Sequence, residues 1–174
     1  MLILDAEAIP FEKIQELLEW NPTVIVDAKS LEVVLGWGIK FDVVLTEHAI
    51  VEKVKLKLTD FAPVKVIGYP QGDNALQTAF QFLSATRQNS VHIVSRAPED
   101  IFYQELNGTS NLRIAVFAAG IQWSLINNGH YEKWLPAGTS VIAKMADGEE
   151  ELRAEIDGIL KINRPGKFWV GEQL

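Results

Sequence analysis

Apolar residues in the first two-thirds of the chain form short runs that alternate with amphipathic segments. The runs predict strands at residues 1–5, 23–27, 42–45, 64–69 and 91–94. Pro10 precedes a segment in which Phe11, Ile14 and Leu18 fall on one helical face, and Pro is favoured at the first helical position. Because strands separated by helices need crossover connections, this pattern predicts an α/β fold with a mainly parallel sheet flanked by helices.

Capping residues predict where the other helices begin and end. Ser30 is typical of an N-cap, and Gly38 of the residue that ends a helix. A second helix has Leu76, Ala79, Phe80 and Leu83 on one face, with Asp73 or Asn74 as its cap. A third covers Pro98–Leu106. Residues 51–58 are ambiguous, because VKLKL alternates like a strand whereas the surrounding pattern requires a helix.

After Asn107-Gly108 the pattern changes to short β-prone runs separated by turn residues. These runs are residues 112–117, 122–127, 131–135, 140–144 and 168–170. Asp157-Gly158, between Ile156 and Ile159, predicts a two-residue hairpin. We therefore predict an α/β domain over residues 1–110, followed by a small antiparallel, sandwich-like β-rich domain over residues 111–174.

Composition excludes several classes of function. The 174 residues include no cysteine, which excludes disulfides, thiolate metal sites and a cysteine nucleophile, and suits a reducing cytoplasm. The formal net charge is −7 and the basic residues are scattered, so nucleic acid is a disfavoured partner. The first residues do not form a signal peptide, and no run approaches the roughly 20 apolar residues of a membrane span. We expect a cytoplasmic protein without a membrane partner.

Acidic residues follow three of the predicted strands. Asp27, Glu47 and Asp73 stand where ligands bind in open parallel sheets, beyond the carboxyl ends of the strands. Such carboxylates could jointly hold Mg²⁺ against the phosphates of a nucleotide. Taken singly, each acid more commonly caps a helix or a turn, so both interpretations stay open.

The remaining signals are weaker. The sequence contains no phosphate-binding loop, dinucleotide-binding motif or nucleophile elbow, and its three histidines lack metal-ligand spacing. Trp123, Trp134 and Trp169 are concentrated in the β-rich part. They either stack on an aromatic ligand or, more commonly, pack in a core or an interface. A small domain can hardly bury three indoles by itself, so they favour a homodimer.

Several segments, taken in order, resemble the thiamine pyrophosphokinase family. LILDAEAIP is similar to the family's first strand. The family's stretch that carries an Asp-Gly-Gly turn and an acidic loop is similar to residues 23–50, TVIVDAKSLEVVLGWGIKFDVVLTEHAI. YPQGDNALQTAFQFL resembles the loop and helix that bear its Thr-Asp pair. WLPAGTSVIAKM and FWVGEQL resemble parts of its small β-domain.

The resemblance implies an α/β catalytic domain, a smaller β-domain, and a homodimer that binds thiamine between domains of partner subunits. The implied reaction transfers pyrophosphate from ATP to thiamine, giving thiamine diphosphate and AMP, with Mg²⁺ as cofactor. Carried over by position, Asp27, Glu47 and Asp73 are the implied catalytic and metal-binding residues. Lys29 and Asp100 are the implied nucleotide-binding residues.

The sequence departs from the family pattern where the chemistry is expected. Ala28-Lys29 replaces the paired glycines, Ala49 replaces the second acid of the acidic loop, and Asn74-Ala75 falls on the Thr-Asp pair. Phosphoryl transfer depends mainly on metal ions and charge placement, and losing one charge stabiliser costs roughly 10²–10³ in rate. Two hypotheses therefore stand. One is a divergent pyrophosphokinase; the other is a pseudoenzyme that binds thiamine or a nucleotide, or serves as a dimeric scaffold.

Overall fold

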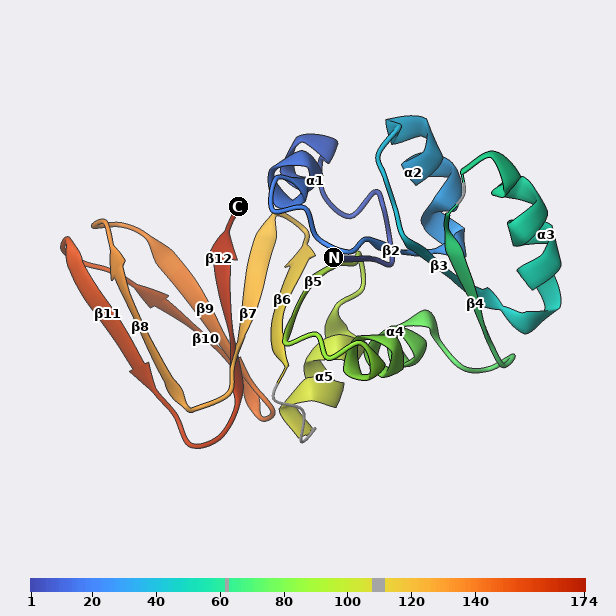
Figure 1. The fold of residues 1–174 in the computed structure, drawn as a ribbon. Coiled ribbons are helices and arrows are strands. Elements are labelled where there is room, and N and C mark those ends of the chain that lie inside the picture. Colours follow the sequence, from blue (N-terminus) through green and yellow to red (C-terminus); the bar gives the residue numbers. More distant parts are fainter. Residues whose placement is uncertain (62, 108–111) are drawn as a thin grey trace. The chain divides into compact units, whose positions relative to one another are not determined.

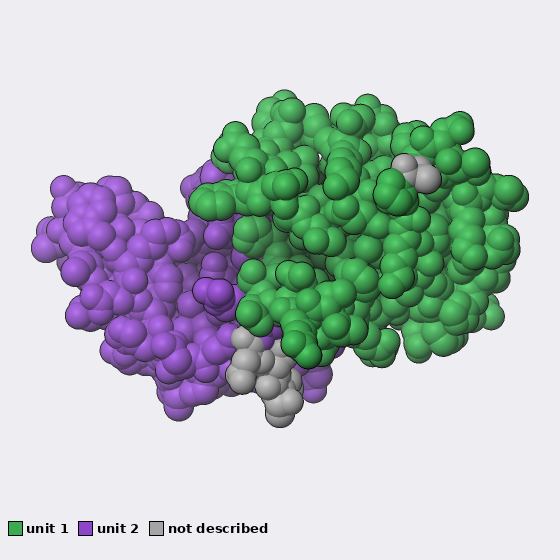
Figure 2. Space-filling view, viewed as in Figure 1, with its two compact units in different colours: residues 1–96 green, residues 97–174 purple. Residues whose placement is uncertain are grey.

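The computed structural model describes residues 1–61, 63–107 and 112–174 of the chain. They form two compact units, residues 1–96 and residues 97–174 (Figure 1, Figure 2). The predicted boundary at residues 110 and 111, with Gly108 of the turn before it, lies outside the described residues.

The first unit contains a parallel sheet in the strand order β5-β1-β2-β3-β4. Its strands are β1 (Leu2–Ile3), β2 (Ile25–Asp27), β3 (Val43–Glu47), β4 (Lys65–Tyr69) and β5 (Ser90–Val94). Each overlaps a predicted apolar run, although β3 extends two residues beyond its run and β5 begins one residue before its run. From β1 to β4 the chain moves steadily in one direction across the sheet, and it then returns past β1 to form β5. Crossover connections are right-handed. The helix that connects β4 to β5 therefore lies on the opposite face of the sheet from the helices that connect β1 to β2, β2 to β3 and β3 to β4.

The helices of the first unit connect these strands. They are α1 (Phe11–Leu18), α2 (Leu31–Trp37), α3 (Val51–Lys57) and α4 (Ala75–Ala85). In Figure 1, α2 and α4 lie on opposite faces of the sheet. The ambiguous segment at residues 51–58 is thus mostly helical, because β3 and β4 are parallel neighbours and need a crossover. Asn74 caps α4 through a bond from the Gln77 N–H, as predicted.

Gly38 ends α2 in the left-handed conformation, with φ at 66°, as predicted, but Ser30 is not its side-chain cap. The buried Ser30 hydroxyl instead accepts a hydrogen bond from the Ala6 N–H (3.0 Å) and donates one to the Leu4 carbonyl (3.1 Å). This long-range pairing satisfies a buried hydroxyl that would otherwise cost free energy. Ser30 therefore occupies the predicted N-cap position of α2, but its hydroxyl does not make the capping hydrogen bond.

The second unit begins with α5 (Glu99–Asn107) and continues with antiparallel strands. These are β6 (Arg113–Ala118), β7 (Ile121–Ile126), β8 (His130–Leu135), β9 (Ser140–Met145), β10 (Gly148–Arg153), β11 (Gly158–Asn163) and β12 (Phe168–Gln173). The order β10-β9-β12-β7-β6 forms one layer, and β11-β8 forms a two-stranded sheet. Tyr131 and Ile162 of the small sheet pack in one core with Phe168 and Val170 of β12. The fold class, parallel α/β followed by antiparallel β, is confirmed.

One local prediction in the second unit was wrong, and one strand was not predicted. Asp157-Gly158 does not form a two-residue hairpin, because β11 pairs with β8 whereas β10 pairs with β9. The Asp157 carboxylate accepts a hydrogen bond from the Ala137 N–H at 2.8 Å, which ties the start of β11 to the end of β8. Strand β10 was missed, because its sequence GEEELR has almost no apolar residue. It is an edge strand whose acidic side chains are largely exposed.

The tryptophans of the second unit differ in how far they are buried. Trp169 is fully buried and Trp123 is 7% exposed. Both rings pack against Phe102 of α5, with ring centroids 4.9 and 5.1 Å away, and the Trp169 indole N–H donates to the Phe102 carbonyl. The unit therefore buries two of these indoles itself and leaves the third at its surface, as expected for a small domain that can hardly bury three. Trp134 is 59% exposed.

None of the helices in the described part of the chain is long and apolar enough to cross a membrane.

Candidate functional site

The carboxyl ends of β2, β3 and β4 bring three polar side chains to one face of the sheet. Asp27 pairs with Leu45, and Glu47, two residues further along β3, pairs with Tyr69. Paired residues of parallel strands point to the same face, and side chains two residues apart do so as well. Asp27, Glu47 and Tyr69 therefore form an edge cluster, and we use that name for these three residues.

Asp27 is the buried acid of the edge cluster. The residue is 6% exposed, and one carboxylate oxygen accepts a hydrogen bond from the Lys29 N–H at 2.9 Å, capping the 3-10 turn Ala28–Ser30. The capping interpretation is thus correct for this residue. Burial raises the pKa of Asp27 above its ordinary value, although the Lys29 N–H and ammonium oppose the rise and Glu47 adds to it.

Tyr69 is the member of the edge cluster that sequence reasoning missed. The residue is 5% exposed. Burial raises the pKa of its phenol, and the negative charges of Asp27 and Glu47 raise it further. The phenol therefore stays protonated at neutral pH and offers both a hydrogen-bond donor and an aromatic ring. Its place as the last residue of β4 is the sequence signal that points to it, because a polar side chain there lies at the carboxyl end of the sheet.

The other predicted site residues lie apart from this arrangement or outside the first unit. Asp73 is exposed in the loop after β4, where its N–H donates to the Pro70 carbonyl at 3.1 Å. Lys29 is exposed in the 3-10 turn beside Asp27. Asp100 is exposed in the first turn of α5, in the second unit. The structure thus brings Asp27 and Glu47 together, and the predicted role of Asp73 stays a prediction.

The donor atoms of the edge cluster do not make a resident metal site. Among the described residues, no group of three or more His, Cys, Asp or Glu side chains is arranged to hold a metal ion. Asp27 and Glu47 supply carboxylate oxygens, whereas Ala49 supplies none. Mg²⁺ needs near-octahedral oxygen coordination, so these side chains do not supply the ligand set of a resident Mg²⁺ ion.

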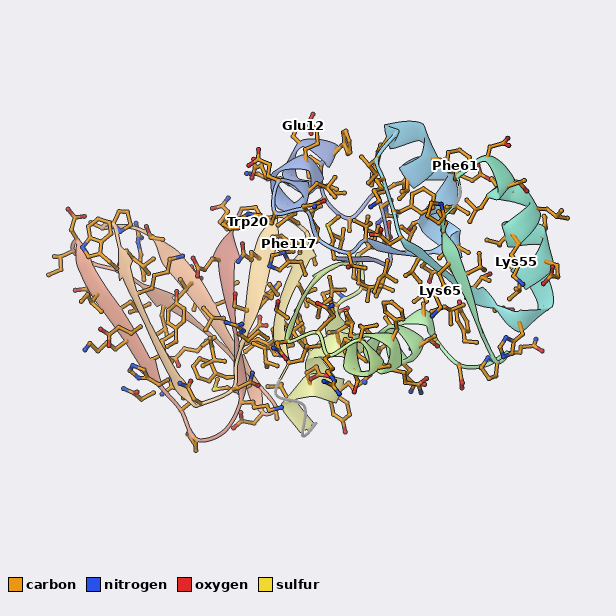
Figure 3. All side chains as sticks on the ribbon, in the orientation of Figure 1. Glu12, Trp20, Lys55, Phe61, Lys65 and Phe117 are labelled. Carbon is orange, nitrogen blue, oxygen red and sulfur yellow. The ribbon has the colours of Figure 1, made fainter. Side chains whose placement is uncertain are left out.

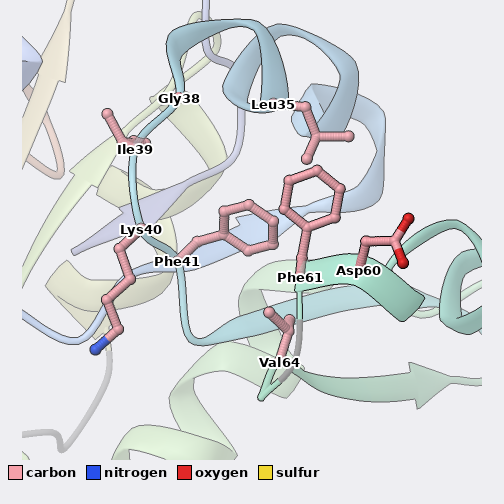
Figure 4. A pocket seen from close by; sticks show the side chains of 8 residues that line it. All are labelled: Leu35, Gly38, Ile39, Lys40, Phe41, Asp60, Phe61 and Val64. Carbon is pink, nitrogen blue, oxygen red and sulfur yellow. The ribbon is translucent and has the colours of Figure 1, made fainter.

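A pocket lies at the opposite, amino end of the strands. It measures about 390 Å³ and adjoins β3 and β4. Leu35, Phe41, Phe61 and Val64 frame it (Figure 4). The two phenylalanine rings are 6.3 Å apart between centroids, which leaves no room for a third ring between them. The side chain of Phe61 is partly exposed at the surface. Trp20 is also exposed, but it lies away from this pocket (Figure 3). This pocket is separate from the edge cluster, because the two lie at opposite ends of the same strands.

Comparison with known proteins identifies the fold. No protein-family model and no curated protein matches the sequence. Solved structures do match. A thiamine pyrophosphokinase from Bacillus subtilis has a TM-score of 0.67 at 10% identity, covering 99% of this chain and 97% of the other. The chain has the thiamine pyrophosphokinase fold.

Two further thiamine pyrophosphokinase structures show the same likeness. The enzyme from Geobacillus thermodenitrificans gives a TM-score of 0.69 at 8% identity, with 100% of this chain and 98% of the other covered. That from Candida albicans gives 0.63 at 9% identity, with 99% and 89% covered. The whole chain therefore follows the thiamine pyrophosphokinase architecture, and the resemblance stated from sequence is confirmed at the level of the fold.

Proposed function

We propose that this protein is a divergent relative of thiamine pyrophosphokinases that binds thiamine, or a related small organic cation, and does not transfer pyrophosphate efficiently. The observation that carries the proposal is the edge cluster. Two carboxylates and a buried tyrosine share one face at the strand ends where ligands of open parallel sheets bind.

The chemistry of the edge cluster favours a cation. The negative charge of Glu47 contributes to the raised pKa of Asp27, and both carboxylates contribute to the raised pKa of the Tyr69 phenol. A cationic ligand relieves this repulsion, and an aromatic ring adds an attraction of about 0.5–2 kcal/mol to a cation over its face. An unscreened polyphosphate would instead meet like charge. These features support a binding site for a cationic ring or an ammonium group.

The enzymatic alternative requires more than the edge cluster supplies. A divergent pyrophosphokinase would use Mg²⁺ and ATP, with Asp27, Glu47 and Asp73 as its reduced set of acids. In the described part of the chain, Asp73 is not grouped with the other two in a metal-binding arrangement. Ala49 and Ala75 carry no oxygen ligand. These positions support a binding role over catalysis.

The proposal is tested by measuring binding and turnover on the same protein. We expect calorimetry to show saturable thiamine binding, and an assay of AMP release with ATP, Mg²⁺ and thiamine to show little turnover. Asp27→Asn and Glu47→Gln should each weaken thiamine binding about tenfold, because each removes a charged acceptor. Tyr69→Leu should weaken it about three- to tenfold.

Glu52→Gln is the matched control, because Glu52 is an exposed acid on α3 that pairs with Lys55 and lies outside the edge cluster. It should leave thiamine binding unchanged. Robust AMP release by the unmodified protein, abolished by Asp27→Ala, would instead establish the enzyme. In that case ATP and Mg²⁺ become its cofactors, and Ala49→Asp with Ala75→Asp should raise the rate further. Absence of both binding and turnover would refute the ligand-binding proposal.

We also propose a homodimer, supported by an exposed apolar patch at the small sheet of the second unit, and a cytoplasmic location, which the cysteine-free sequence suits. Trp134 and Ile159 are cross-strand partners that are 59% and 57% exposed, and Ile156 is 77% exposed. Aromatic and aliphatic anchors of this kind are typical of interfaces. Light scattering should return twice the 19.4 kDa chain mass, and Trp134→Ser with Ile159→Thr should shift it towards the monomer. A monomer at micromolar concentration would refute the dimer.

A further inference from the structure

A further pocket of the first unit lies at the amino end of the strands, between the turns that follow α1 and α4. It measures about 320 Å³, and we call it the helix-end pocket. The edge cluster lies at the other, carboxyl end of the same sheet, so the two are separate. The lining of the helix-end pocket includes Trp20, Pro22, Leu83, Gln88, Ser90 and His92.

Both turns hold a residue other than glycine in the left-handed conformation. Asn21, after α1, has φ at 47°, and Arg87, after α4, has φ at 55°. The Gln88 N–H donates to the Leu83 carbonyl at 2.9 Å, so Arg87 stands where a helix usually ends in glycine. This conformation costs free energy in other residues, and such strained residues are concentrated at binding sites. The two turns thereby fix the backbone on which Trp20 and Gln88 reach the pocket.

The lining combines an exposed indole with uncharged polar groups. Trp20 is 84% exposed (Figure 3), and the Gln88 amide and the Ser90 hydroxyl each offer a donor and an acceptor. Burial is the main cause that lowers the pKa of His92 below its ordinary value, so its imidazole is mostly neutral at pH 7. Burial also lowers the pKa of the Met1 amino group to about 6. In the part of the chain that the structure describes, no Asp, Glu, Lys or Arg lines this pocket.

We propose that the helix-end pocket binds an uncharged planar ring that carries amide-type donors and acceptors, as neutral nitrogen heterocycles do. The Trp20 indole supplies a face on which such a ring stacks. The Gln88 amide can pair with a donor and an acceptor at the edge of the ring. A charged ligand would lose its hydration without gaining a counter-charge.

The size of the helix-end pocket suits a ligand of one or two rings. Pockets for small molecules measure roughly 300–1,000 Å³, and this one is at the lower end of that range. The inference goes beyond the proposed function and is independent of it, because it uses no residue of the edge cluster.

The test uses nicotinamide and hypoxanthine as neutral probes, titrated against the full chain. In ¹H–¹⁵N NMR spectra, the indole N–H signal of Trp20 is identified among those of the five tryptophans by its loss in Trp20→Phe. Both probes should shift this signal saturably, with a Kd of about 1 mM for ligands of this size. Nicotinate has the same ring with a carboxylate, and it should bind at least tenfold more weakly, because the pocket offers it no counter-charge.

Variants of the lining assign the contacts, with dissociation constants measured from the NMR signals of the probes. Trp20→Ala should weaken binding of both probes at least fivefold, because it removes the stacking face. Gln88→Ala should weaken it about two- to fivefold, the effect of one neutral hydrogen bond. Tyr103→Ala and Gln81→Ala are the matched controls, because Tyr103 is a 75% exposed ring of α5 and Gln81 is an exposed amide of α4 that does not line the pocket. Both should leave binding unchanged.

Four results would overturn the proposal. One is no shift of the Trp20 signal at probe concentrations up to about 10 mM. Another is equal binding of nicotinate and nicotinamide. A third is unchanged binding in Trp20→Ala with an unaltered circular dichroism spectrum. The fourth is equal weakening by Tyr103→Ala and Trp20→Ala, which would reduce the effect to general stacking on exposed rings.

Discussion

Gly171 lies where a single methyl group should destabilise the second unit. Gly171 of β12 is the cross-strand partner of Trp123 of β7. A Cβ atom there would lie 2.8 Å from Cζ3 of the indole and 2.9 Å from Cε3 and Cη2, whereas ordinary contacts begin at 3.4 Å. The ring cannot easily move away, because Trp123 is 7% exposed and packs against Phe102.

Gly171→Ala combines two opposing effects. Replacing glycine within a strand gains about 0.5–1 kcal/mol, because the unfolded chain loses conformational freedom. Overpacking the rigid ring costs about 1–3 kcal/mol. The overpacking should prevail, leaving the variant about 1–2 kcal/mol less stable and lowering Tm by roughly 2–8 °C for a chain of this length. Urea unfolding followed by circular dichroism, together with calorimetry, measures both quantities.

Two further variants isolate the cause. Gly158→Ala in β11 is the matched control, because a Cβ atom there meets nothing within 4 Å; it should not reduce stability. In a Trp123→Phe background, the smaller ring should remove most of the cost of Gly171→Ala. The reasoning is refuted if Gly171→Ala is as stable as the unmodified protein, or if its cost is the same beside Phe.

Three other substitutions test local features of the first unit. Gly36→Ala should stabilise the protein by about 0.5–1 kcal/mol in urea unfolding, because Gly36 lies inside α2 and its Cβ would meet nothing within 4 Å; a loss of stability would contradict this. Asn74→Ala should lower the free energy of unfolding by about 0.5–2 kcal/mol, because it removes the hydrogen bond from the Gln77 N–H that caps α4. Asn74→Asp keeps a side-chain acceptor and should retain most of this stability. Burial raises the pKa of Asp27, so its contribution to stability is fully present below the ordinary value of 3.8 and is lost as pH rises through the folded pKa. As pH rises from acidic to neutral, the free energy of unfolding should therefore fall less in Asp27→Asn than in the unmodified protein. The same pH dependence of stability in both proteins would contradict this.

The sequence by itself determined most of the elements and the class of the fold. Apolar runs and helical periodicity are local properties of a segment, so they located the strands of the parallel sheet and the helix that follows Asn74. The change to turn-separated strands likewise predicted the antiparallel second unit. The same local signals identified Asp27 and Glu47 as acids at strand ends.

Tertiary structure decided which elements are partners. The Asp157-Gly158 turn has the local chemistry of a hairpin, yet its flanking strands pair elsewhere, because strand pairing is set by the core that both sheets share. Ser30 has the local chemistry of a helix cap, yet its buried hydroxyl is satisfied by the loop after β1. In both cases a long-range contact outweighs the local preference.

The candidate sites depend even more on strand order. Tyr69 joins Asp27 and Glu47 only because β2, β3 and β4 are neighbours in the sheet. Trp20 and Gln88 line one pocket only because β2 and β5, the strands that follow them, both pair with β1. Residue types and spacing fix what each side chain can do, whereas the order of strands in the sheet fixes which charges lie within reach of one another. Hydrogen bonds need close contact, and interactions between exposed charges are screened with distance, so the chemistry of these sites is a property of the folded chain.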